Sequence, residues 1–139
     1  MARSVFTNCY LLVNSVDLSN RVQQVAVNRQ ADKVEVTAMT ATGKEYLPGL
    51  RDDSIEVTFR QDFASTSVDQ TLDPLFAGGS TFLVKVAANG SSFSATNPVY
   101  SGTCALFEYS PISGNVGDAL DAPTVFAMAN GGSIVRGTA

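Results

Sequence analysis

Apolar and polar residues alternate with a period of two along most of the chain. The alternation is clearest in Lys-Val-Glu-Val-Thr-Ala at residues 33–38, Ser-Ile-Glu-Val-Thr-Phe-Arg at residues 54–60 and Thr-Phe-Leu-Val-Lys-Val-Ala at residues 81–87. This period predicts half-buried β-strands, each with a second face that contacts water or a partner. Runs rich in Val, Thr, Phe or Tyr predict further strands at residues 5–13, 22–27, 99–109 and 124–128, the last resuming at 133–136.

Turn-forming residues separate the predicted strands. Residues 30–32, Gln-Ala-Asp, predict a tight reversal between the second and third strands. Asn89-Gly90 is a strong hairpin signal, and Gly131-Gly132 interrupts the last run. Short strands with turns between them are typical of an antiparallel β-sandwich or barrel. The length of 139 residues suits a single domain that spans residues 1–139.

One segment has the period of a helix instead. Residues 67–76 place apolar side chains at helical spacing, namely Val68, Leu72, Leu75 and Phe76. Thr66 or Ser67 can cap this helix, and Asp69 favours its first turn. Because Pro74 is unfavourable inside a long helix, we expect a short one that ends near residues 77–79. It would flank the sandwich and cover one open edge or face.

Residues 39–53 form the longest stretch without a clear period, and we expect a long inter-strand loop there. Loops of this length in a compact domain are usually functional or disordered. This one carries Tyr46, Leu47 and Leu50, which a solvated loop does not need. These side chains either fold back onto the body or dock onto a neighbouring molecule.

A second loop, at residues 110–123, contains three residues with oxygen ligands for calcium, Asn115, Asp118 and Asp121. Their spacing fits no EF-hand, and the glycines of this loop already explain a turn. We therefore expect no metal site.

The chain is poor in charge, which changes the picture of its surface. Charged residues make up 16%, against about 25% in ordinary domains, while hydrophobic residues make up 45%. Such a chain is expected to hide surface against a partner. With 9 basic and 13 acidic residues its net charge is −4, which excludes a basic domain that grips nucleic acid by its phosphates. No apolar run is long enough to span a bilayer. Thr7 and Asn8 interrupt the N-terminal apolar stretch, so we interpret it as a strand of a protein made in a cytoplasm.

The chemistry of the chain argues against an enzyme. There is no His, so a serine or cysteine nucleophile lacks its usual base. A glycosidase pair remains formally possible, because four carboxylates lie in or beside strands, namely Asp52, Asp53, Glu56 and Glu108. Adjacent residues of a strand face opposite ways, and solvated turn charges explain residues 52–53 better. We expect no catalysis and no cofactor.

The two cysteines, Cys9 and Cys104, match no zinc or redox spacing. We interpret them as small buried hydrophobic residues in strands. The alternative is a disulfide between the first and sixth strands, which would need Cα atoms within about 7 Å.

The order of these elements is similar to that of a known family. A strand opening at residues 16–22 is followed by Lys-Val-Glu-Val-Thr-Ala-Met at residues 33–39 and by a loop that ends Tyr-Leu-Pro-Gly-Leu-Arg-Asp at residues 46–52. The strand at residues 54–59, the short helix, Tyr100-Ser101-Gly102 and the loop at residues 110–118 come next. Over residues 17–126 this order resembles the tail tube (major tail) proteins of long-tailed bacteriophages.

The resemblance implies a β-sandwich whose copies form rings of six, and rings that stack into a hollow virion tail assembled in the host cytoplasm. The loop at residues 40–52 would reach the adjacent ring, through Lys44, Tyr46, Leu47, Pro48, Leu50 and Arg51. The terminal segments, residues 1–4 and 133–139, would also contact neighbouring subunits. The implied partners are other copies of the chain and the tape measure, tail terminator and tail initiator proteins.

A tube of this kind is a conduit for double-stranded DNA during ejection. Six copies of a chain with net charge −4 give a strongly negative ring, which lets DNA pass without specific binding. We expect Glu35 and Glu56 to face the lumen, with Asp32 and Asp62 behind them. The alternative is that each is an ordinary solvated strand residue.

Two other functions stay open at this point. The same sandwich could serve as a capsid decoration, connector or minor tail protein of a virion. A carbohydrate-binding module is a more distant alternative, because the chain has no Trp and its tyrosines at 46, 100 and 109 are scattered.

Overall fold

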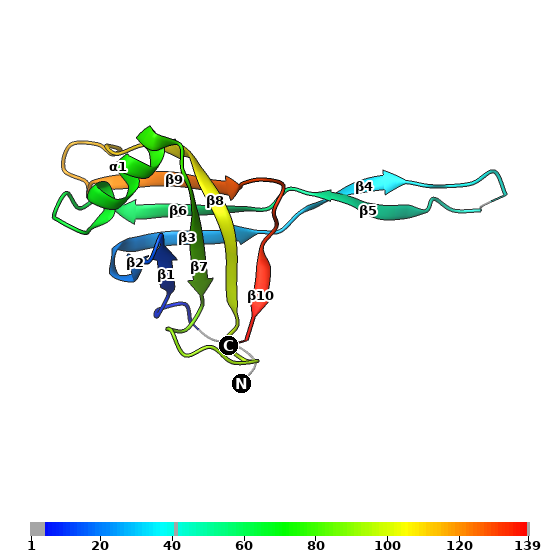
Figure 1. The fold of residues 1–139 in the computed structure, drawn as a ribbon, viewed down its shortest axis with the longest axis horizontal. Coiled ribbons are helices and arrows are strands. Elements are labelled where there is room, and N and C mark those ends of the chain that lie inside the picture. The colour runs from blue at the N-terminus through cyan, green and yellow to red at the C-terminus, as the bar shows by residue number, and fades with distance from the viewer. Residues whose placement is uncertain (1–4, 41, 139) are drawn as a thin grey trace.

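The fold is seen in a computed structural model that describes residues 5–40 and 42–138 (Figure 1). Residues 1–4, Ala41 and Ala139 lie outside the described residues, and with them the neighbour contacts expected of the first four residues. Ten strands, one α-helix and one 3-10 helix make up the described part. In chain order they are β1 (Tyr10–Val13), β2 (Val16–Asp17), η1 (Ser19–Arg21), β3 (Val22–Asn28), β4 (Ala31–Glu35), β5 (Tyr46–Arg51), β6 (Ser54–Arg60), α1 (Val68–Gly78), β7 (Thr81–Ala87), β8 (Val99–Tyr109), β9 (Asp121–Met128) and β10 (Val135–Gly137).

The body is one antiparallel sheet folded over on itself. Its strand order is β2-β1-β7-β8-β9-β6-β3, and β10 pairs with β8 beside this path. Strand β8 joins the two halves: its first residues pair with β10 and its last with β9, while its other edge pairs with β7. Figure 1 shows β3, β6 and β9 running across β1, β7 and β10. The prediction of a mainly β, antiparallel sandwich with one short flanking helix is confirmed.

The hydrophobic core lies between the two halves. On β6 every second residue, Ile55, Val57 and Phe59, is buried, as the alternation predicts. Phe126 of β9 and Phe82 of β7 meet edge to face with ring centroids 5.7 Å apart. Burial of this kind supplies most of the stabilising free energy of a sandwich.

Helix α1 closes one end of the sandwich and confirms the predicted helical segment. Val68, Leu72 and Leu75 are buried, and the hydroxyl of Tyr109 on β8 donates a hydrogen bond of 2.8 Å to Asp69. Burial raises the pKa of Tyr109 to about 12, and the Asp69 carboxylate adds to that rise. Gly79 ends the helix in the left-handed conformation, with φ of 64°.

The predicted reversal at residues 30–32 is wrong. The chain leaves β3 and continues in the same direction into β4, and β5 returns into β6 (Figure 1). Asn28 pairs with Ser54, and further out Glu35 pairs with Tyr46. The segment at residues 39–53 is therefore not irregular throughout, because it contains β5. We call the described residues 31–40 and 42–51, which project from the body as a two-stranded ribbon, the arm.

Strand β4 of the arm is exposed at every residue, so the prediction that it is half-buried is also wrong. Alternation shows which residues share a face of a strand, but it does not show that another layer covers that face. Gly49 allows the two arm strands to approach closely, since a Cβ there would lie 2.8 Å from Cγ2 of Val34.

The two cysteines are free, which overturns the disulfide alternative. Cys104 is buried in β8, and its burial raises the pKa of its thiol to about 12. Cys9 is half-buried just before β1, so the expectation of two buried strand residues holds for Cys104 alone. In the described part of the chain, no helix is long and apolar enough to cross a membrane.

Candidate functional site

The side of the sheet that faces away from the core, over β3, β6, β9 and β8, carries exposed carboxylates on β6 and β8. We call this side the outer face. Register places Ala26, Glu56, Val125 and Glu108 in one line across the four strands. Glu56 and Glu108 are both exposed, and neither forms an ion pair within residues 5–40 and 42–138. The line therefore presents two unpaired carboxylates, with the apolar side chain of Val125 between them.

A β-bulge brings Glu108 onto the outer face. Leu106 pairs with Phe126 and Glu108 with Val125, so Phe107 is an extra residue without a partner on β9. Strict alternation from Cys104 and Leu106 would turn residue 108 toward the core. Sequence reasoning considered Glu108 only as a formal catalytic carboxylate and missed this position. A charged residue at the end of a run of alternately buried positions was the signal for the bulge.

A second polar pair lies further along the same face. Arg60 of β6 donates a hydrogen bond of 2.8 Å to Asp121 of β9, and these residues are register partners. Both side chains are partly exposed, so the pair contributes at most about 1 kcal/mol to stability. The charges of Arg60 and Asp121 largely cancel. The net charge of the outer face is therefore set by Glu56 and Glu108, and it is negative.

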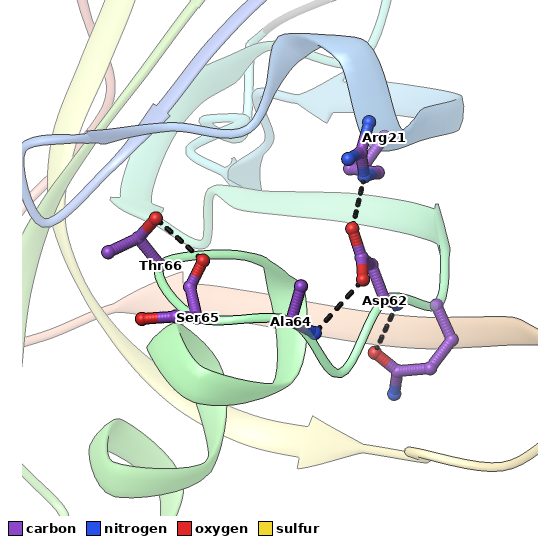
Figure 2. Close-up of polar contacts among 6 residues, drawn as sticks. Arg21, Asp62, Ala64, Ser65 and Thr66 are labelled. Carbon is purple, nitrogen blue, oxygen red and sulfur yellow. Dashed lines mark hydrogen bonds and ion pairs between the residues drawn. The ribbon is translucent and has the colours of Figure 1, made fainter.

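The four residues expected at a lumen lie on three different features. Glu56 is on the outer face, while Asp32 and Glu35 are on the arm. Asp62 follows β6 and accepts hydrogen bonds from the Ala64 backbone N–H at 3.0 Å and from Arg21 at 2.8 Å (Figure 2). The Ala64 N–H, the Arg21 guanidinium and the Ser67 hydroxyl hold the pKa of Asp62 below its usual range.

The arm presents apolar side chains that are not covered by the body, as far as residues 5–40 and 42–138 describe it. Leu50 is 81% exposed, Leu47 57% and Tyr46 41%. The ammonium of Lys33 lies 3.8 Å from the centroid of the Tyr46 ring, a cation–π contact between β4 and β5. Of the two possibilities for these side chains, folding back onto the body is excluded. Five of the six expected contact residues are thus available to a neighbour, namely Lys44, Tyr46, Leu47, Pro48 and Leu50.

The sixth residue, Arg51, points to the root of the arm, where it pairs with Asp53. Asp53 is only 1% exposed, so the interpretation of residues 52–53 as solvated turn charges is wrong for Asp53. Burial alone would raise its pKa and is the largest influence. The N–H groups of Ile134 and Gln30 and the Arg51 guanidinium together outweigh burial, so the pKa of Asp53 lies below its usual value.

Strand β3 leaves one long edge open. This strand of seven residues stands at the end of the strand order, and among the described residues it pairs only with β6. The opposite end of the order is β2, which has two residues. An open edge is a template for pairing with another chain, and proteins that do not use such an edge usually protect it.

The four tyrosines lie in separate places and are not gathered into a platform for a sugar ring. Tyr10 of β1 packs edge to face on Phe93. Tyr46 lies on the arm under Lys33, Tyr100 lies under the guanidinium of Arg29 at 5.7 Å, and Tyr109 is bound to α1. Within the described ranges no three His, Cys, Asp or Glu side chains are placed to hold a metal ion.

Comparison with solved structures identifies the fold. No protein-family model matches the sequence, and no curated protein matches it. A chain in the virion of a native gene transfer agent particle superposes with a TM-score of 0.75 and 16% identity, covering 96% of this chain and 99% of that one. The SPP1 tail tube gives a TM-score of 0.73 and 14% identity over 95% of this chain and 77% of that one.

The tail of an empty gene transfer agent particle, refined with C6 symmetry, gives a TM-score of 0.67 and 18% identity. It covers 83% of this chain and 82% of that one. The chain therefore has the tail tube protein fold, and the resemblance noted in its sequence is confirmed at the level of the fold.

Proposed function

We propose that this chain is a structural, non-enzymatic virion protein whose copies form rings of six that stack into a tail tube. The observation that carries the proposal is the arm, which exposes Tyr46, Leu47 and Leu50 on a ribbon with no body surface to cover them. A solitary protein gains nothing from such a ribbon, whereas a stacked assembly buries it. The fold shared with the SPP1 tail tube supports the same conclusion.

Within a ring, the open edge of β3 supplies the contact between neighbouring copies. Closing the sheet from copy to copy removes open edges, as barrels do. The C6 symmetry of the gene transfer agent tail supports six copies per ring. Between rings, the arm extends away from the end of the body that α1 closes (Figure 1), and it would contact a copy in the adjacent ring.

The outer face is the best candidate for the lumen wall. In this arrangement Glu56 and Glu108 of six copies form a ring of unpaired carboxylates. Such a ring repels the phosphates of double-stranded DNA, so DNA passes without being held. Of the earlier candidates only Glu56 lies on this face, while Asp32 and Glu35 belong with the arm contact. The tape measure, terminator and initiator proteins of the tail would be the further partners.

Electron microscopy of the purified protein at rising concentration tests the proposal. We expect tubes of constant diameter built from six-fold rings. A protein that stays monomeric at high concentration, even with tail initiator present, contradicts it. Copy number per particle separates the alternatives within a virion, because a tube protein is present as many rings and a connector as one.

Reversing the charge of the outer face should make assembled tubes retain DNA. Glu56→Lys combined with Glu108→Lys replaces the unpaired carboxylates by ammonium groups, which release counterions from DNA on contact. Duplex DNA should then bind, with an affinity that falls as salt rises, at a slope of about −0.9 per phosphate contacted. Co-sedimentation of tubes with short DNA duplexes at several salt concentrations measures this affinity and its dependence on salt.

The matched control is Asp73→Lys with Asp118→Lys, which changes the net charge equally at two exposed positions outside both the arm and the outer face. If the control tubes retain as much DNA as the outer-face variant, the outer face does not line the channel.

A further inference from the structure

The buried carboxylate of Asp53 lies where three separate segments of the chain meet. One oxygen accepts the backbone N–H of Gln30 at 2.9 Å, at the start of the arm, and Nε of Arg51 at 3.2 Å, at the end of β5. The other oxygen accepts the backbone N–H of Ile134 at 2.8 Å, just before β10, and an Arg51 terminal nitrogen. The residue that precedes β4, the last residue of β5 and the C-terminal segment are thus bound to one side chain.

The arm has few other contacts that could fix its direction. Every residue of β4 is exposed, and of β5 only Gly49 is partly covered. An isolated two-stranded ribbon is only marginally stable and has no second layer to hold it straight. Where the arm joins the body, one backbone hydrogen bond, from Asp52 to the carbonyl of Gln30 at 2.8 Å, continues the pairing. The direction of the arm is therefore decided at its root.

The energetics of burial make the three segments depend on one another. A buried carboxylate is costly unless its oxygens are fully hydrogen-bonded, and removing one partner leaves an uncompensated charge. Asp53 is satisfied only when Gln30, Arg51 and Ile134 are all in place. Swinging the arm removes the first two donors, and releasing the C-terminal segment removes the third.

We propose that Asp53 is a positioning residue that sets the direction of the arm and couples it to the seating of residues 133–137. The effect of Asp53 on ring stacking rests on the proposed function, because only in a stacked tube would a correctly aimed arm meet a neighbouring copy. The coupling itself is a property of the single chain. Release of the C-terminal segment in one subunit therefore frees its arm, and an arm held by a neighbour keeps that segment seated.

The test measures the arm in unassembled protein. Spin labels at Gly43→Cys near the arm tip and Thr103→Cys on β8, in a Cys9→Ala background, report the distance distribution between arm and body. Gly43 has open space around it, and Thr103 is exposed. Asp53→Asn should broaden this distribution and speed amide exchange at Ile134 by about tenfold or more. A chain that ends at Gly132 should broaden it in the same way.

Asp52→Asn is the matched control, because it makes the same chemical change at the adjacent, exposed carboxylate; it should leave both readouts unchanged. If Asp53→Asn does not fold, Arg51→Gln removes the guanidinium donors alone and should give the same broadening. A narrow distribution together with unchanged exchange at Ile134 overturns the inference. If Asp53→Asn forms normal tubes and its arm does not move, the inference about Asp53 is overturned while the proposed function stands. If the unaltered protein fails to form tubes, only the proposed function is contradicted.

Discussion

Replacing residues 32–50 by an Asn-Gly turn is expected to leave a folded monomer that no longer forms tubes. Ala31 and Arg51 are register partners, so a two-residue turn can join them and shorten the ribbon without disturbing Gln30, Arg51 or Asp53. No described residue of the arm belongs to the buried core, so the free energy of unfolding should hardly change. Sedimentation and electron microscopy separate loss of stacking from loss of folding.

A single substitution gives the same test with less disturbance. Leu50→Ser removes a side chain that is 81% exposed in the free protein, and burying a leucine contributes about 1.5–3 kcal/mol. The concentration needed for tube growth should therefore rise by about tenfold or more. Val116→Ser, at an apolar side chain fully exposed in the loop after β8, is the control. Tubes that grow at the ordinary concentration without the arm would show that stacking uses another surface.

The largest loss of stability is expected for Phe126→Ala. Phe126 is fully buried, packs edge to face on Phe82, and pairs with Ile55 and Leu106 on the two neighbouring strands. Truncating a buried phenylalanine removes its transfer free energy and leaves a cavity, at a cost of about 3–5 kcal/mol. Since domains of this size are stable by about 5–15 kcal/mol, much of the total is lost. Urea unfolding of the monomer, with the slope m unchanged, measures the loss.

Phe107→Ala provides the comparison, because it makes the same truncation on the adjacent strand at a side chain that is 63% exposed. Its cost in the free energy of unfolding should stay within about 0.5 kcal/mol. Equal losses for the two variants would mean that the core does not lie between the two halves of the sheet.

The body strands were predictable because alternation and burial agree in them. Residues 54–60 and 81–87 have one face packed in the core, and the helix at residues 68–78 shows the period of its buried side. In the arm, by contrast, alternation and burial do not agree, and the prediction of a half-buried strand was wrong there. Val34 and Val36 alternate as core residues do, yet both are more than 40% exposed, because no second layer of the described chain packs on the arm.

The candidate site was only partly predictable. The apolar residues at 46–50 were predicted to be a contact surface, and the structure shows that Tyr46, Leu47 and Leu50 are exposed. Their contact with a neighbour stays a prediction. Glu108 was missed because the one-residue bulge at Phe107 moves the side chains after it to the opposite face of the strand. The alternation of the sequence does not show where such an unpaired residue lies. Asp53 was misjudged because its partners, Gln30 and Ile134, come from distant parts of the chain.

Local chemistry was enough to establish a β protein with one short helix, a low charge and no histidine, and to point to an apolar contact segment. These features depend on composition and on the period of two, and both can be read from residues that are close together in the sequence. Only the tertiary structure decided that β3 runs on into an arm, that Glu56 and Glu108 share one face, and that a single carboxylate binds both ends of the arm's root and the C-terminal segment. The last two of those facts join residues far apart in sequence, and the first depends on the pairing of β3 with β6 and of β4 with β5. Contacts of that kind form only when the backbone has brought the segments together.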